Sequence, residues 1–278
     1  KNLKKKKKQT IKLIKTIKSY NYFLIAFYFW FFQRYLYNIM DLLKIIKNNL
    51  FIQNFAASII SAIPPYLEFS VSKYFAIKKA MYVTAHDATH GSYLEFGVFT
   101  GSSFNFAIKA KKKMDKIFGK MDCEFIGFDS FQGFGEISKN DEHPAFKNKV
   151  FSVFVNKEKV IKNIQKFSKG QKSRIIEGFY KDTIKNKTTV DFKIDKARII
   201  MIDCDLKEST RLALEFVKPS IQEGTVIIFD DYNCYKGNKD KGEFAAFSDF
   251  RKKYPEISFR RIFDCGYFGR AFIACKIN

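Results

Sequence analysis

SYLEFGVFTGSS, residues 92–103, is the stretch that decides the fold. It places an apolar run holding one acid, Glu95, directly before two glycines four residues apart, Gly97 and Gly101, and then opens an amphipathic segment. This order predicts a strand, a tight turn and a helix, because glycine adopts backbone conformations that other residues avoid. A helix that begins at such a turn presents free N–H groups to polar or anionic ligand atoms. Taken alone, the stretch indicates either a nucleotide pocket or an ordinary strand-to-helix connection.

Short apolar runs alternate with helical patterns downstream of this turn. Strands are predicted at residues 124–128, 173–177, 197–202 and 225–229, with a closing pair at 257–262 and 267–276. Strands that alternate with helices indicate a parallel sheet with helices on both faces, so we predict an α/β fold. Residues 131–150 combine glycine, proline and mixed charge, and we expect them to form a lid-like loop over the strand ends.

The positive charge of the chain is concentrated toward its N-terminal end. The formal net charge is +22 over 278 residues, and residues 1–60 hold eleven lysines and one arginine against one acid. Pro64-Pro65 then interrupts the helical spacing. We therefore predict a basic, aromatic-rich helical extension over residues 1–63 and one domain over residues 64–278.

The composition of this extension suits a membrane surface. Five consecutive lysines, Lys4–Lys8, precede an apolar aromatic block at residues 22–32, which is shorter than the ~20 residues that span a bilayer. Lysines and aromatics together favour an anionic membrane surface, contacted through residues 1–40. The alternative is that the block packs on the domain or on a second subunit and forms a homo-oligomer. Nucleic acid is disfavoured, because the lysines precede the aromatics instead of alternating with them.

The cysteines and the extension together indicate a location. The five cysteines are widely spaced, and no C-x-x-C pair occurs, so we interpret them as reduced thiols. We expect a cytoplasmic protein that is peripheral at the membrane.

Acidic pairs follow two of the predicted strands. Asp203 and Asp205 come after residues 197–202, and Asp230-Asp231 come after the next strand. Because parallel strands present their carboxyl ends on one side of a sheet, four carboxylates are expected to meet there. Carboxylates crowded together repel one another unless protons or a cation compensate, and an oxygen-only cluster suits Mg²⁺ or Mn²⁺. The alternative is that these aspartates cap helices and solubilise loops.

A further acid, Asp129, ends the predicted strand at residues 124–128 and is followed by Ser130. An acid at the end of the second strand of a doubly wound sheet binds ribose hydroxyls, since a carboxylate can accept hydrogen bonds from a vicinal diol. Asp129 is therefore the leading candidate for a ribose ligand.

Five motifs in order resemble one family. YLEFGVFTG, GFDSFQGF, GFYKDT, MIDCDLKEST and VIIFDDY are similar to segments of the macrocin O-methyltransferase family, class I S-adenosylmethionine-dependent and metal-dependent sugar O-methyltransferases. The resemblance runs from about Gly91 to Tyr232. It implies a Rossmann-like seven-stranded class I methyltransferase sheet, S-adenosylmethionine as the cofactor and Mg²⁺ or Mn²⁺ as the metal.

The resemblance also implies roles for particular residues. The cofactor positions are Glu95, Gly97, Gly101, Ser102, Asp129 and Ser130. The metal positions are Asp203, Asp230 and Asp231, and Asp205 is the general base. Apart from the resemblance, the place of His143 in the lid-like loop makes it a rival base. Two departures, Lys207 where the family usually has tyrosine and Phe134-Gly135 where Leu-Pro is common, put the acceptor in doubt.

These observations predict an enzyme. We expect it to transfer a methyl group from S-adenosylmethionine to a hydroxyl of a sugar or glycan-type acceptor, with a divalent metal chelating the acceptor hydroxyls and an aspartate as base. The alternative is a non-catalytic, basic membrane- or nucleic-acid-binding protein on the same scaffold.

Overall fold

The computed structural model describes residues 48–146 and 155–277. The chain divides between Pro64 and Pro65 into two units. Within the first, helix α2 (Leu50–Ser61) carries no charged residue and buries none of its side chains. The predicted lysine-rich helix and the apolar aromatic block lie outside the described residues. The role predicted for the extension therefore stays a prediction.

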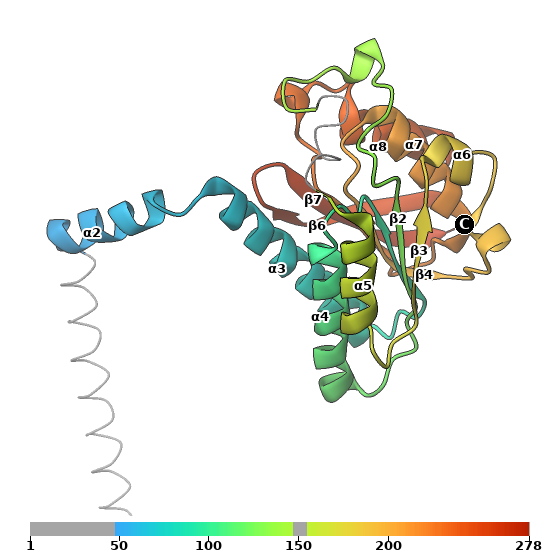
Figure 1. Ribbon diagram of the computed structural model, residues 1–278, viewed down its shortest axis with the longest axis horizontal. Coiled ribbons are helices and arrows are strands. Elements are labelled where there is room, and N and C mark those ends of the chain that lie inside the picture. The colour runs from blue at the N-terminus through green and yellow to red at the C-terminus, as the bar shows by residue number, and fades with distance from the viewer. Residues whose placement is uncertain (1–47, 147–154, 278) are drawn as a thin grey trace, which may run out of the picture. The chain divides into compact units, whose positions relative to one another are not determined.

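The second unit is built on a seven-stranded sheet with the order β3-β2-β1-β4-β5-β7-β6 (Figure 1). The strands are β1 (Ser92–Phe96), β2 (Phe125–Asp129), β3 (Ser173–Glu177), β4 (Ala197–Ile202), β5 (Val226–Phe229), β6 (Ile257–Cys265) and β7 (Gly269–Ile277). β1 to β5 pair in parallel, whereas β7 runs antiparallel to both β5 and β6. The strand order reverses between β1 and β4, and the crevice at such a switch point is where doubly wound sheets bind ligands.

Helices cover both faces of this sheet, as predicted (Figure 1). One face carries α3 (Pro65–His86), α4 (Ser102–Phe118) and α5 (Lys157–Phe167), and the other carries α6 (Tyr180–Thr183), α7 (Lys207–Val217) and α8 (Gly242–Lys253). Side chains of the strands alternate between the two cores: Leu94 and Phe96 of β1 face α7 and α8, whereas Tyr93 faces α3 and α4. Because side chains on both faces of the central strands are buried, each of these strands is a continuous apolar run.

Short 3-10 helices complete the connections. They are η1 (Lys139–Asp141), η3 (Thr189–Phe192), η4 (Lys218–Ser220) and η5 (Tyr235–Gly237). Over the described residues, no single helix is long and apolar enough to cross a membrane. Among the same residues, only α2 and α3 counted together, as one bent pair, have the length and composition of a membrane span.

The turn between β1 and α4 requires its two glycines. Gly97 has φ +94°, and a Cβ there would lie 1.8 Å from the Asp203 carbonyl oxygen. Gly101, with φ +76°, caps α4, and a Cβ there would press on Ile164 of α5 at 3.1 Å. Gly97 thus lets the ends of β1 and β4 approach each other, and Gly101 lets two helices pack.

The helix before β1, α3, extends to His86 and so into the HDATH stretch of residues 86–90. Near its end, the buried Thr84 hydroxyl donates to the Ala80 carbonyl at 2.9 Å, so this polar group is satisfied within the helix. The short helix α6 follows β3 along the chain.

Candidate active site

A cavity of about 360 Å³ lies at the carboxyl ends of the parallel strands. Its polar and charged side chains come from Lys73, Asp129, Ser130, Tyr180, Asp203, Cys204, Asp205, Ser209, Asp230 and Asp231. Its apolar wall comes from Phe69, Phe99, Phe131, Phe134, Phe146, Val155 and Phe179. The volume falls within the roughly 300–1,000 Å³ range of small-molecule sites. An aromatic wall with a few convergent polar groups is the lining expected of such a site.

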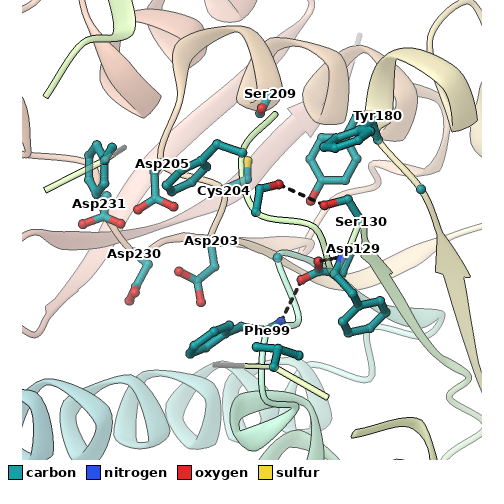
Figure 2. A pocket seen from close by; sticks show the side chains of 18 of the residues that line it. Phe99, Asp129, Ser130, Tyr180, Asp203, Cys204, Asp205, Ser209, Asp230 and Asp231 are labelled. Carbon is teal, nitrogen blue, oxygen red and sulfur yellow. Dashed lines mark hydrogen bonds between the residues drawn. The ribbon is translucent and has the colours of Figure 1, made fainter. Parts of the chain in front are cut away.

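Four aspartates meet on one side of the cavity, as their places after β4 and β5 predicted (Figure 2). Ile202 ends β4 and Phe229 ends β5, and these two residues are paired in the sheet. Asp203 and Asp230, which follow them, therefore start from neighbouring positions. One carboxylate oxygen from each of Asp203, Asp230 and Asp231 lies within 4.8 Å of the others. The sheet therefore brings together the three residues predicted to hold a metal.

Asp205 completes this acidic group from a strained backbone position. Its φ is +61°, a left-handed conformation that non-glycine residues seldom adopt and that is often retained at functional sites. Burial raises the pKa of the Asp205 carboxyl well above its ordinary value, and the neighbouring charge of Asp231 raises it further. A carboxyl with a raised pKa that faces a cavity is suited to accepting a proton.

Lys73 of α3 lies against the acidic group, although no motif in the sequence marks it as a site residue. Its Nζ is 2.7 Å from Asp203 Oδ2 and 2.5 Å from Asp230 Oδ2. Burial on its own would lower the pKa of Lys73, but the two carboxylates raise it well above the ordinary lysine value. Lys73 therefore stays protonated beside the acidic group and carries a positive charge there.

Glu243 of α8 adds a fifth carboxyl behind Asp231. It is fully buried, and its Oε2 accepts a hydrogen bond from the Asp231 backbone N–H at 3.0 Å. Its Oε1 has no hydrogen-bond partner among the described residues. Burial raises the pKa of Glu243 well above its ordinary value, and the Asp231 charge adds to this.

These groups fit a hard divalent cation. The donors are all carboxylate oxygens, and five acidic groups face a single lysine, so negative charge is in excess unless protons or a cation compensate. A buried carboxyl oxygen without a partner is a further sign of missing positive charge. The oxygen-only set suits Mg²⁺ or Mn²⁺ and does not suit zinc.

Asp129 lies on the other side of the cavity, beside the glycine turn (Figure 2). Its Oδ2 accepts hydrogen bonds from the backbone N–H groups of Val98 and Phe99, both at 2.7 Å, and its Oδ1 accepts one from Phe131 at 2.6 Å. Burial raises the pKa of Asp129, and these three backbone bonds oppose the rise. Three of its roughly four acceptor positions are used, so the carboxylate can accept one ribose hydroxyl instead of two.

The other predicted cofactor residues divide into two groups. Gly97 and Ser130 line the cavity, and the Ser130 hydroxyl donates to the Gly133 carbonyl at 2.9 Å. Gly101, Ser102 and Glu95 do not line it. Ser102 is exposed at the start of α4, outside the lining of the cavity.

Glu95 connects the strand and the helix on either side of the glycine turn. Its two carboxyl oxygens accept hydrogen bonds from the Tyr93 hydroxyl at 2.5 Å and from the Ser103 hydroxyl at 2.7 Å. The side chain is fully buried, and burial raises its pKa to about 8 despite the two hydroxyl donors. Glu95 therefore links β1 to α4 and does not line the cavity.

Glu95→Gln is expected to change how stability depends on pH. Glu95 takes up its proton at about pH 8 in the folded protein and at about 4.5 in the unfolded chain. Its contribution is full below pH 4.5 and is lost as the pH rises through 8, at up to about 1.4 kcal/mol per pH unit. Urea unfolding from pH 5 to 8 should show the wild type losing more stability than Glu95→Gln. Parallel curves for the two proteins would contradict the assignment.

His143, the rival base, does not line the cavity. Its ring packs on Phe146 and Tyr235, with centroids 4.5 Å and 5.0 Å away, and its Nδ1 accepts a hydrogen bond from the Ala145 N–H at 3.2 Å. The ring supports Phe146, which does line the cavity. Of the two predicted bases, the structure places Asp205 in the cavity.

Comparisons with known proteins relate the sequence to one family of enzymes. A family model described as macrocin-O-methyltransferase (TylF) matches residues 73–257, well over half of the chain. The demethyldecarbamoylnovobiocin O-methyltransferase of Streptomyces niveus is 28% identical over 131 residues, which are 45% of this chain and 46% of that protein. The chain thus spans about half the length of the curated relative it matches.

Two solved structures share the fold. The O-methyltransferase NovP has a TM-score of 0.58 at 22% identity, with 74% of this chain and 81% of that chain covered. CalS11, described as a TDP-rhamnose 3'-O-methyltransferase of calicheamicin biosynthesis, has a TM-score of 0.51 at 18% identity, with 84% and 92% covered. At these identities the likeness shows the fold alone, and it confirms the predicted class I methyltransferase sheet.

Proposed function

The chain belongs to the macrocin-O-methyltransferase (TylF) family, and on that premise we propose that it is an S-adenosylmethionine-dependent O-methyltransferase acting on a hydroxyl of a sugar or glycan-type acceptor. The observation that carries the proposal is the joining of two half-sites in one cavity. The glycine turn with Asp129 forms one half, and the acidic group after β4 and β5 forms the other.

The first half suits S-adenosylmethionine. Gly97 permits a close approach to the backbone, Asp129 retains one acceptor position for a ribose hydroxyl, and Phe99 and Phe131 offer aromatic faces to an adenine ring. The sulfonium of the cofactor is positively charged, and the acidic side of the cavity stabilises it. Ser130 is a further polar contact.

The second half suits a divalent metal and an acceptor diol. Asp203, Asp230 and Asp231 would hold Mg²⁺ or Mn²⁺. When bound, such an ion lowers the pKa of hydroxyls that it chelates, which makes a sugar hydroxyl a better nucleophile. The TDP-rhamnose named for CalS11 supports a sugar as the acceptor class.

Asp205 is the proton acceptor in this proposal. Bound S-adenosylmethionine would supply the methyl group, and its sulfur would keep the electron pair of the broken carbon–sulfur bond. The Asp205 carboxylate would take up the proton of the acceptor hydroxyl. The left-handed backbone of Asp205 fixes the carboxylate in the cavity. Alignment of oxygen, methyl and sulfur by the cavity walls supplies much of the remaining acceleration.

Titration calorimetry with S-adenosylmethionine tests the enzyme against its non-catalytic alternative. We expect binding that is stronger for the wild type than for Asp129→Ala. Since Asp129 also ties the turn, melting curves of the variant must accompany the titration. An absence of binding at millimolar S-adenosylmethionine would favour a basic scaffold protein that binds membrane or nucleic acid.

We also propose that the N-terminal unit binds an anionic membrane surface. The support is the lysine-rich sequence of residues 1–60 together with an uncharged α2, in which Phe51 and Phe55 are 78% and 61% exposed. In the full chain, Phe51→Ser with Phe55→Ser should weaken pelleting with phosphatidylserine vesicles at least about tenfold, because two exposed rings no longer insert. Val190→Ser, which removes another exposed side chain, is the control. Equal pelleting of all three proteins would refute the membrane surface and leave a second copy of the chain as the partner.

A further inference from the structure

Lys73 is the single basic side chain among the described residues that line the cavity. Its Nζ contacts one oxygen each of Asp203 and Asp230, at 2.7 Å and 2.5 Å. Only 15% of the Lys73 side chain and 4% of the Asp230 side chain are exposed. The ammonium is therefore the counter-charge of two of the three carboxylates that the proposed function assigns to a metal.

The ammonium and a divalent ion compete for these oxygens. Mg²⁺ contacts its carboxylate ligands at about 2.0–2.1 Å, so an ion bound by Asp203 and Asp230 would be a close neighbour of an ammonium that kept the same partners. Two positive charges at such a separation repel strongly in a buried site. Lys73 must withdraw from at least one carboxylate when an ion binds.

Helix α3 allows this withdrawal. The stretch of the helix before Lys73, residues 65–72, has no buried residue, whereas the longer stretch after it is anchored through Ala76, Ile77, Ala80 and Met81. The Lys73 Nζ also lies 5.1 Å from the centre of the Phe69 ring, one turn earlier on the helix. An aromatic face at this distance stabilises a cation, so the ring can go on stabilising the ammonium when it loses a carboxylate partner.

We propose that Lys73 is an internal counter-ion that occupies the acidic group in the metal-free protein and competes with the divalent ion for Asp203 and Asp230. It keeps the crowded carboxylates compatible with a folded cavity before the metal arrives. It also lowers metal affinity, because each ion that binds displaces the ammonium. This inference rests on the proposed function for the existence of the metal site.

Metal titrations of the full chain test the competition. Mn²⁺ binding is measured by electron paramagnetic resonance for the wild type, Lys73→Met, Lys73→Gln and Lys79→Met. Lys79 is on the same helix, but its ammonium lies over the Phe263 ring and touches none of the acids. Both Lys73 variants should bind Mn²⁺ at least about tenfold more tightly than the wild type, which is ~1.4 kcal/mol, and Lys79→Met should match the wild type.

Melting curves give a second readout that does not depend on affinity. Without metal, Lys73→Met and Lys73→Gln should melt below the wild type, and Mn²⁺ should raise their melting temperatures more than that of the wild type. Equal or weaker Mn²⁺ binding by folded Lys73 variants would overturn the inference and leave the metal site standing. An absence of Mn²⁺ binding in all four proteins would overturn both, while S-adenosylmethionine binding would still test the cofactor half separately.

Discussion

Asp231→Asn is expected to lower turnover at saturating Mg²⁺ by at least about a hundredfold, because a metal ligand is replaced by a neutral amide and several kcal/mol of charge stabilisation depend on the ion. Asp231 is the most suitable of the three ligands for this test, since it does not pair with Lys73. Its Oδ1 accepts from the Cys234 thiol at 2.9 Å, and the amide oxygen of asparagine preserves this contact. Steady-state formation of S-adenosylhomocysteine measures the loss.

The control for this substitution comes from the same connection. Asp240→Asn changes an exposed carboxylate in the loop that follows β5 and should leave turnover unchanged. Calorimetry should show that Asp231→Asn binds S-adenosylmethionine as the wild type does, because the cofactor half of the cavity is untouched. Turnover of Asp231→Asn within threefold of the wild type, with metal and without it, would remove Asp231 from the metal site.

Asp205→Asn is expected to reduce turnover by roughly 10²–10⁴-fold, the usual contribution of a general base. Asparagine tolerates the left-handed backbone that Asp205 adopts at φ +61°, so the loop should keep its conformation. The amide cannot accept the hydroxyl proton. Single-turnover rates at saturating acceptor measure this step directly.

Asp195→Asn is the matched control for the base. Asp195 is exposed and precedes β4, at the opposite end of the strand from Asp205. Asp205→Asn should still bind S-adenosylmethionine and Mn²⁺. This result would show that the variant lacks the base and that its binding site is intact. A variant that keeps most of its single-turnover rate would show that another group takes the proton, and His143 would then need a lid movement to reach the cavity.

The sheet and the acidic group could be predicted because both follow from local sequence. Residues 173–177 and 197–202 form β3 and β4 with the predicted bounds, since each is an apolar run between turn residues. Parallel pairing then brings the acids that follow β4 and β5 to one edge. The meeting of these acids therefore follows from the order and parallel pairing of the strands alone.

The groups that complete the site could not be predicted in the same way. Lys73 is 130 residues from Asp203 and stands in a helix with two further lysines, Lys78 and Lys79, where a solvent-facing role is the ordinary interpretation. Glu243 stands in the first turn of α8, and only the packing of this helix behind Asp231 reveals that the side chain is buried. The direct cofactor contact implied for Glu95 stays a prediction. In the structure, the carboxyl oxygens of Glu95 accept hydrogen bonds from Tyr93 and Ser103.

The central claim is metal-dependent methyl transfer to one of two neighbouring hydroxyls, and one measurement tests it most directly. Formation of S-adenosylhomocysteine is followed with a panel of sugar acceptors, each with Mg²⁺ or with EDTA, and each beside its deoxy analogue that lacks one hydroxyl of the pair. We predict product with at least one vicinal diol in Mg²⁺, and at least about a hundredfold less both in EDTA and with the deoxy analogue. Equal rates in Mg²⁺ and EDTA, or equal rates with diol and deoxy sugar, would contradict it.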